Sequence, residues 1–231
     1  SDGTQVDGGW RIHPEQAAAG LWSTPTDLAK FAIELSKAYR GKSKILNQEL
    51  AQKLLSPVFK DKDLSEAFGG QPAITFIVSG EGEEFRFAHG GGNLGYRSYM
   101  VMFPSSGKGA VFMANSDAGY GVGMEMMRAV SEVYKWPNFK SQALNRTKAD
   151  KKAQKTFLGE YKFDSGWQAN IIPTNQADGI AVKFPNGDIY PLTAIEGESK
   201  YVHEDTGVRV KFSKVDGQSQ LHLYNQIGKM K

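Results

Sequence analysis

Three closely spaced apolar runs dominate the hydrophobic pattern in the middle of the chain. They cover Phe85–His89, Tyr96–Phe103 and Ala110–Ala114, and turn-forming residues bound each run. The connections Gly90–Gly95 and Pro104–Gly109 are so short that we expect antiparallel hairpins. Because the last two runs are apolar at nearly every position, both faces of the predicted sheet should be covered.

Helical signals precede this predicted sheet. Thr24 is placed as an N-cap, with Pro25 at the first helical position and Asp27 closing a capping box, and the helix should end near Gly41. Its predicted buried face has four apolar residues at helical spacing: Leu28, Phe31, Ala32 and Leu35. A second helix is predicted at Asn47–Leu55, and a further strand at Ala73–Val78.

A helix is also predicted after the sheet, leading from Ala118–Gly123 through Tyr134. Its apolar residues recur at spacings of four, four and three, which predicts that this stripe packs across the sheet. The stripe comprises Val122, Met126, Val130 and Val133.

The composition changes in the second part of the chain. Residues 138–156 are rich in lysine and arginine and poor in large apolar residues, which predicts a basic linker. From Phe157 onward, short alternating runs are punctuated by Asp178-Gly179, Asn186-Gly187 and Asp216-Gly217, each a tight-turn signal. About seven strands in residues 157–231 predict a small antiparallel barrel or sandwich.

The totals exclude several classes of protein. The 231 residues, 40% of them hydrophobic, are enough for one large or two ordinary globular domains. No apolar run is long enough to span a bilayer, and we expect any signal peptide to lie outside this chain. Cysteine is absent, so disulfides and thiolate metal sites are excluded. A net charge of +3, and a basic segment without interleaved aromatics, give no reason to expect nucleic acid.

The candidate chemistry centres on His89, which three glycines follow where the first predicted strand ends. One interpretation is a glycine hairpin beside a core histidine satisfied by backbone groups. The other is a binding site, because backbone without side chains lets a ligand reach main-chain N–H groups. The helices on either side of the predicted antiparallel sheet favour the second interpretation.

Other candidates are weaker. The four histidines, at positions 13, 89, 203 and 222, lack the spacing of zinc sites, so we expect no metal and no cofactor. Ser105 and Lys108 match the Ser-x-x-Lys pattern of serine acylases, in which a helix brings the lysine to the serine. They lie between two predicted strands, so we interpret this match as chance.

Three stretches together resemble the serine β-lactamase and penicillin-binding-protein-like family, which includes esterases and D-alanyl-D-alanine carboxypeptidases. Residues 17–31 (AAAGLWSTPTDLAKF) resemble the family's "AAGGL-STA-DLA-F" segment. Residues 89–96 (HGGGNLGY) resemble its third active-site motif, in the "HTGG-PGF" form. Residues 109–116 (GAVFMANS) resemble its strand ending in "LTN". Phe157–Lys231 is similar to the lipocalin-like barrel that follows this domain in many members.

The resemblance implies roles for the residues of the glycine motif. His89 stands where the family has the lysine of Lys-Thr-Gly, and the N–H of Gly92 is one of two oxyanion donors. Gly90 replaces the motif's hydroxyl residue, which weakens the usual anchor for a substrate carboxylate. The resemblance also implies that Gly90, Gly91 and Asn93 contact substrate. The family's Ser-x-x-Lys nucleophile and its Tyr-x-Asn or Ser-x-Asn element lie before the first matching stretch and are absent here.

These implications predict an α+β fold, an antiparallel sheet flanked by helices, followed by an all-β antiparallel barrel. Residues 1–137 would be the C-terminal half of a β-lactamase/transpeptidase-like domain, residues 138–156 the linker and residues 157–231 the barrel. The expected function is the C-terminal part of a serine acyl hydrolase that acts through an acyl-enzyme on a small ester, peptide or lactam, in a bacterial periplasmic or secreted setting.

The expected partner is the N-terminal half of the same protein, which would carry the nucleophile. Without it, one edge of the strand Ala110–Ala114 should be unpaired, and self-association is a second way to cover that edge. The alternative function is a non-catalytic binding module that uses the sheet as a scaffold and the barrel to hold a ligand or peptide.

Overall fold

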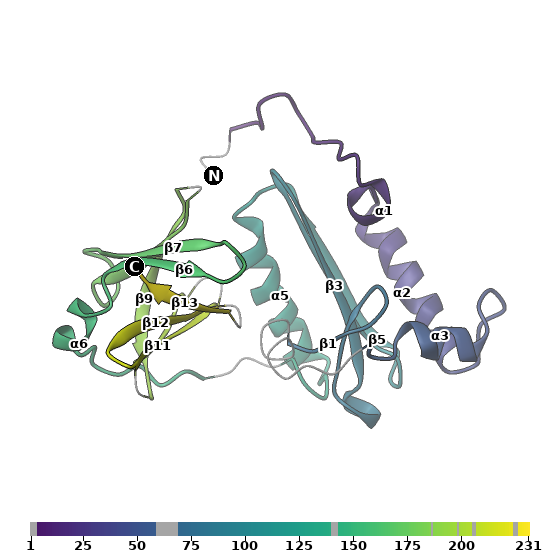
Figure 1. Ribbon diagram of the computed structural model, residues 1–231. Helices are drawn as coiled ribbons and strands as arrows, with labels where there is room; N and C mark the ends of the chain where they lie inside the picture. The colour runs from purple at the N-terminus through teal and green to yellow at the C-terminus, as the bar shows by residue number, and fades with distance from the viewer. Residues whose placement is uncertain are drawn as a thin grey trace. The chain divides into compact units, whose positions relative to one another are not determined.

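The computed structural model describes residues 4–58, 69–139, 143–185, 187–197, 199–204, 207–223 and 226–231. The chain divides into two compact units, Ser1–Ser141 and Gln142–Lys231 (Figure 1). The first unit is an antiparallel sheet with helices on both faces, and the second is a closed antiparallel barrel. The α+β class with a C-terminal barrel is therefore confirmed.

The sheet of the first unit has five strands in chain order, β1-β2-β3-β4-β5. Their bounds are Gln71–Pro72 (β1), Ile77–Ser79 (β2), Arg86–Asn93 (β3), Tyr96–Phe103 (β4) and Lys108–Ala114 (β5). The predicted single strand at Ala73–Val78 is wrong. The N–H of Ala73 donates to the carbonyl of Phe76 in a turn between β1 and β2, so this stretch forms a small hairpin. A short 3-10 helix, Gly82–Glu84, precedes β3.

The glycine motif lies within a strand, which corrects the predicted connection at Gly90–Gly95. Gly90, Gly91 and Gly92 pair with Tyr99, Ser98 and Arg97 of β4. Only Leu94 and Gly95 form the turn, and the φ of Gly95 is +80°, a left-handed value that glycine adopts without strain. The run without side chains therefore extends β3 beyond the predicted end at His89.

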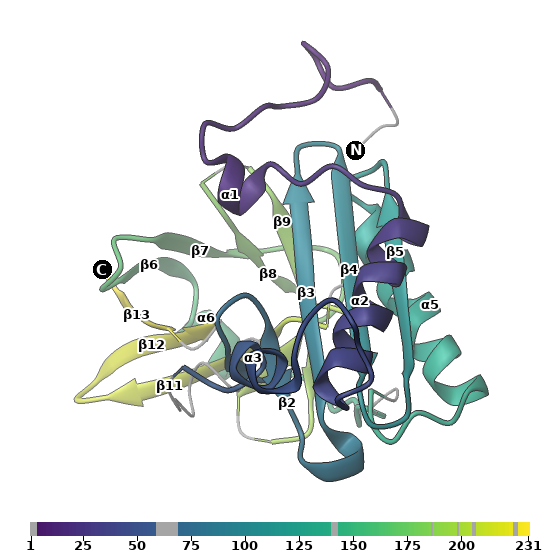
Figure 2. The same ribbon diagram turned by 90° about the vertical axis from the view of Figure 1, so that its right-hand side faces the viewer.

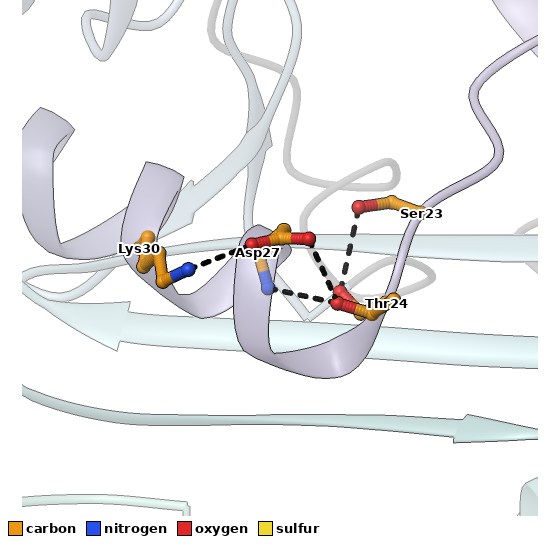
Figure 3. Close-up of polar contacts among 4 residues, drawn as sticks. All are labelled: Ser23, Thr24, Asp27 and Lys30. Carbon is orange, nitrogen blue, oxygen red and sulfur yellow. Dashed lines mark hydrogen bonds and ion pairs between the residues drawn. The ribbon is translucent and has the colours of Figure 1, made fainter.

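Helices α1 (Gln16–Ala19), α2 (Pro25–Tyr39) and α3 (Gln48–Leu54) follow the N-terminal segment. The predicted cap of α2 is confirmed, because the Thr24 hydroxyl accepts a hydrogen bond of 3.1 Å from the N–H of Asp27 (Figure 3). The capping box differs in one detail. The Asp27 carboxylate accepts from the Thr24 hydroxyl and pairs with Lys30 at 2.9 Å (Figure 3).

One face of the sheet packs against α2 and α3. Ala32 and Leu35 of α2 are buried there as predicted, and the strand residues Phe87, Met100 and Met102 belong to the same core. Phe31, predicted to be buried, is 51% exposed and stacks on Phe76 at the border of this core.

The opposite face of the sheet packs against α5 (Gly119–Val133; Figures 1 and 2). The helix is where the sequence predicts it and packs across the sheet, but most of the predicted buried stripe is wrong: Val122, Met126 and Val133 are 62%, 59% and 75% exposed. Of that stripe, only Val130 packs against the core of the sheet. Its buried residues are Gly123, Met127 and Ser131. The cause is close contact, because a Cβ at Gly123 would overlap the Phe112 ring.

The second unit is a closed barrel with the order β10-β11-β12-β13-β6-β7-β8-β9, eight strands where about seven were expected. In chain order the strands are Gly159–Phe163 (β6), Gln168–Pro173 (β7), Ile180–Lys183 (β8), Ile189–Ile195 (β9), Lys200–Val202 (β10), Arg209–Val215 (β11), Gln218–Leu223 (β12) and Gln226–Met230 (β13). The predicted turn at Asp216-Gly217 is confirmed, with φ values of +51° and +80° at the two residues. Asn186 of the second predicted turn lies outside the described residues.

Part of the predicted basic linker packs against the barrel. Arg146 makes a β-bridge with Ile195, and helix α6 (Lys151–Lys155) begins with Asp150 as its side-chain cap. Ala149 and Ala153 pack against the barrel core. That core consists of buried side chains, among them the stacked rings of Phe157 and Phe212, whose centroids are 4.4 Å apart. Among the described residues, no helix is long and apolar enough to cross a bilayer.

Candidate functional site

The candidate site is the free edge of β3. Strand β2 pairs with one edge of β3 from Arg86 to Ala88, and β4 pairs with the other edge as far as Asn93. In the part of the chain that the structure describes, no strand pairs with the first of these edges beyond Ala88. His89, Gly90, Gly91 and Gly92 are all exposed. The edge therefore presents main-chain groups that a ligand could reach.

The register of the β3–β4 hairpin gives the direction of these groups. Asn93 and Tyr96 flank a two-residue turn and form a hydrogen-bonded pair. Hydrogen-bonded and non-hydrogen-bonded pairs alternate along an antiparallel ladder. Gly91 therefore bonds to β4, whereas Gly90 and Gly92 direct their N–H groups toward the free edge.

Backbone strain does not account for the three glycines, because none of them has a positive φ. A methyl group at Gly90 would lie 3.5 Å from the Tyr99 ring, an ordinary contact, and one at Gly91 would meet only the movable Ser98 hydroxyl. A methyl group at Gly92 would lie 3.3 Å from the Arg97 guanidinium. Gly90 and Gly91 thus have room for a side chain, and their bareness leaves the edge open.

His89 lies at the start of the free edge, on the sheet face that carries Phe87. Its side chain is exposed, and its ring is perpendicular to Phe76 with the centroids 6.4 Å apart. His89 is therefore not the core histidine of the first interpretation.

Tyr99 is the tyrosine nearest to the glycine run, on the opposite sheet face. It stacks on Phe139, and burial raises the pKa of Tyr99 to about 12. The phenol is therefore protonated at neutral pH, so Tyr99 is a poor candidate for a general base.

No sequence motif marks the three residues that surround the end of β3. His13 Nε2 lies 2.5 Å from the Asn93 side-chain oxygen, so the N-terminal segment engages one of the residues predicted to bind substrate. Arg97 and Asp117 form an ion pair of 2.7 Å at the β3–β4 turn. Only tertiary structure joins these residues, because the partners are distant in sequence.

The residues before α2 also contribute aromatic side chains at this end of the sheet, where they cross the β3–β4 turn (Figure 2). Trp22 packs edge-on against Tyr96 at 5.1 Å between centroids, and Trp10 packs against Trp22 at 6.4 Å. A methyl group at Gly95 would touch Val6. The segment that carries the first family-like motif therefore lies against the third motif.

The remaining candidates have other partners. The Ser105 hydroxyl donates to the Gly82 carbonyl at 3.1 Å, and the Lys108 ammonium donates to the Tyr134 carbonyl at 2.8 Å. Neither contact joins the serine to the lysine. Within the described ranges, no group of three or more histidine and carboxylate side chains could hold a metal ion.

Comparison with known protein families gives a match for the first unit. The sequence model of the family described as Beta-lactamase matches residues 2–135, more than half of the chain. No curated protein matches the chain in sequence.

Solved structures give a weaker likeness. A crystal structure of SurE with D-Leu matches with a TM-score of 0.50 and 14% identity, over 89% of this chain and 49% of that one. A second SurE structure (TM-score 0.47, 13% identity, 90% and 48% coverage) and an octameric penicillin-binding protein homologue from Pyrococcus abyssi (0.44, 17%, 90% and 46%) also match. The chain spans about half the length of these structures.

Proposed function

The chain belongs to the beta-lactamase family of serine hydrolases, and from this we propose that it is the C-terminal part of an acyl hydrolase whose nucleophilic serine lies outside these residues. The observation that carries the proposal is the free, exposed edge of β3 from His89 to Gly92. A bare strand edge with outward N–H groups suits the binding of a carbonyl oxygen.

In the proposed reaction, the serine attacks the carbonyl carbon of an ester, amide or lactam, and the C–O or C–N bond of that group breaks. An alcohol or amine then leaves, or a lactam ring opens with its nitrogen still attached, and water finally releases the acyl group from the serine. The oxygen becomes negatively charged in each tetrahedral intermediate. The Gly92 N–H is directed so that it can donate to that oxygen, together with the N–H of the serine itself. A preorganised donor of this kind is typically worth a factor of about 10²–10³ in kcat.

His89 is proposed to position the substrate or to transfer a proton. Its imidazole is exposed at the start of the free edge, where it can contact a ligand bound along that edge. Gly90 and Gly91 would allow the substrate main chain to lie close to β3, and Asn93 would contact its far end. With Gly90 in place of a hydroxyl residue, esters and peptides are proposed as better substrates than β-lactams.

The family also supports the proposal that the complete protein works in the periplasm or outside the cell. The alternative, a binding module that holds its ligand in the barrel, is weakened by the packing of that barrel. Fourteen buried apolar residues form its core, so its interior is occupied by side chains among the described strands.

The first prediction tests the missing nucleophile. The 231-residue chain should give no turnover of a chromogenic ester or a chromogenic β-lactam, and no adduct with a fluorophosphonate probe, because binding and one oxyanion donor add little without a nucleophile. The complete protein should be labelled stoichiometrically at one serine before residue 1. A stoichiometric adduct on Ser105 or on any other serine of this chain would contradict the proposal.

A further inference from the structure

Arg97 is the cationic side chain that lies across Gly92. It stands opposite Gly92 in the β3–β4 register, and its guanidinium is the nearest group to a methyl placed at that glycine. Nη1 donates to two main-chain carbonyls, that of Asn93 at 2.6 Å and that of Tyr96 at 2.9 Å. Arg97 therefore holds both residues that flank the β3–β4 turn.

Asp117 completes this arrangement from another part of the chain. One carboxylate oxygen pairs with Arg97 Nη2 at 2.7 Å, and the other accepts a hydrogen bond of 3.1 Å from the Gly95 N–H. Asp117 lies in the connection between β5 and α5, so the pair ties the turn to a segment that is 22 residues from Gly95 in sequence. About a third of each side chain is exposed, and the pair is thus partly shielded from solvent.

Two roles can be distinguished for a cation beside the glycine edge. As a substrate anchor, Arg97 would need an uncompensated charge and terminal nitrogens that are not already bonded to the protein. Instead, both hydrogens of Nη1 are directed at carbonyls of its own chain, and the carboxylate of Asp117 balances the charge. The geometry therefore favours an action on the backbone over contact with substrate.

The local backbone needs such support. Three consecutive glycines and Gly95 have high conformational freedom, and among the described strands none bonds to the free edge of β3 beyond Ala88. Charge-assisted hydrogen bonds are about twice as strong as neutral ones, so they are suited to holding such a segment. A displacement of about 1 Å at a reacting group can cost about 10²-fold in rate.

We propose that Arg97 and Asp117 are a positioning pair that holds the tip of the β3–β4 hairpin, and with it the Gly92 N–H, in the orientation that oxyanion binding requires. The proposal deepens the acyl-hydrolase function and rests on it for its catalytic consequence. Its structural part concerns the hairpin alone.

The structural part is tested on the 231-residue chain by NMR. Arg97→Met and Asp117→Asn should each lower the backbone order parameter of Gly92 from the rigid range, about 0.85, toward the flexible range, below about 0.6. They should also speed amide exchange at Gly95 by about tenfold or more, and leave Val101 in the middle of β4 unchanged. Arg146→Met, which breaks an ion pair of 2.6 Å with Glu204 in the barrel unit, is the control. An unchanged Gly92 in both variants would overturn the proposal.

The catalytic part is tested on the complete protein. Arg97→Met and Asp117→Asn should lower kcat by roughly 10–10²-fold with little change in KM, and the double variant should be no worse than the poorer single variant. Arg97→Lys keeps the positive charge and should recover part of the lost kcat. Such a recovery would show that the loss in Arg97→Met is not caused by a failure to fold.

The outcomes separate the two proposals. A substrate anchor would instead raise KM in Arg97→Met and leave Asp117→Asn active, and that result would overturn the positioning role. If the wild-type complete protein shows no acyl transfer while the NMR changes occur as expected, the proposed function fails and the structural role of the pair stands.

Discussion

At the scale of single residues, His89 and its three glycines carry the proposed chemistry. The structure places them on one exposed strand edge, with alternate N–H groups directed outward. The lack of side chains at these glycines indicated a site in the sequence, since glycine in a strand often marks close approach of a ligand or another backbone. Arg97 and Asp117 gave no such signal, because an arginine and an aspartate twenty residues apart are unremarkable until the fold joins them.

The second prediction concerns His89 in the complete protein. His89→Ala should lower kcat/KM by roughly 10²–10⁴-fold, the usual contribution of a positioned acid or base, without lowering the unfolding temperature. His222→Ala is the matched control, because His222 lies in the barrel unit and bonds Ser213. Equal, full activity in both variants would leave His89 without a catalytic role.

A third prediction concerns Gly90, the position where the family has a hydroxyl residue. Gly90→Thr should fold normally, because its Cβ would lie 3.5 Å from the Tyr99 ring and the backbone φ is not positive. In the complete protein, the new hydroxyl should lower KM for β-lactams, which carry a carboxylate, and leave neutral esters unaffected. Steady-state kinetics with one substrate of each kind make the test. A KM that changes equally for both would argue against a carboxylate anchor at this position.

At the scale of elements, α5 shows how a correct helix prediction can have the wrong face. Hydrophobic spacing favoured a stripe of four residues, of which Val122, Met126 and Val133 are exposed. The helix instead buries Gly123, Met127 and Ser131 against the sheet. Gly123 allows close contact with Phe112, and the buried Met127 lies one turn further along the same face. Hydrophobic spacing therefore predicts that the helix has a buried face, whereas close packing against the sheet decides which face that is.

The fourth prediction tests that orientation. Gly123→Leu should lower the free energy of unfolding by about 1–3 kcal/mol or more, because the new side chain must displace the Phe112 ring. Val122→Ala, at an exposed position on the same helix, should change it by less than about 0.5 kcal/mol in this chain. Urea denaturation of the two variants measures both values. A larger loss in Val122→Ala than in Gly123→Leu would show that the predicted stripe faces the sheet after all.

At the scale of the whole molecule, β5 is the last strand of the sheet, and in the described residues it pairs only with β4. Helix α5, which carries the exposed residues Val122, Met126 and Val133, follows β5 in the chain. We propose that the N-terminal half of the same protein covers the β5 edge in the complete enzyme, with self-association as the alternative in its absence. An uncovered strand edge of this kind readily pairs with another chain.

The fifth prediction follows from the register of β5. Phe112 and Ala114 are opposite Tyr99 and Arg97, whose main-chain groups bond to β5, so the amides of Val111 and Met113 face the open edge. In a monomer of this chain, Val111 and Met113 should exchange rapidly and Phe112 slowly, and addition of the N-terminal half should protect the first two. If a strictly monomeric sample protects Val111 as strongly as Val101 of β4, the edge is covered from within the chain.

The sequence by itself determined the class of the fold, the three central strands, the start of α2, the existence of α5, the antiparallel barrel and the family. These features depend on short-range properties: capping residues, turn residues, the period of apolar positions and motifs of a few consecutive residues. Tertiary structure alone decided which face of α5 is buried, that the glycines continue β3 instead of ending it, and that Arg97 meets Asp117. These features depend on contacts between residues distant in the chain, where close packing and strand register, rather than local preference, select the arrangement.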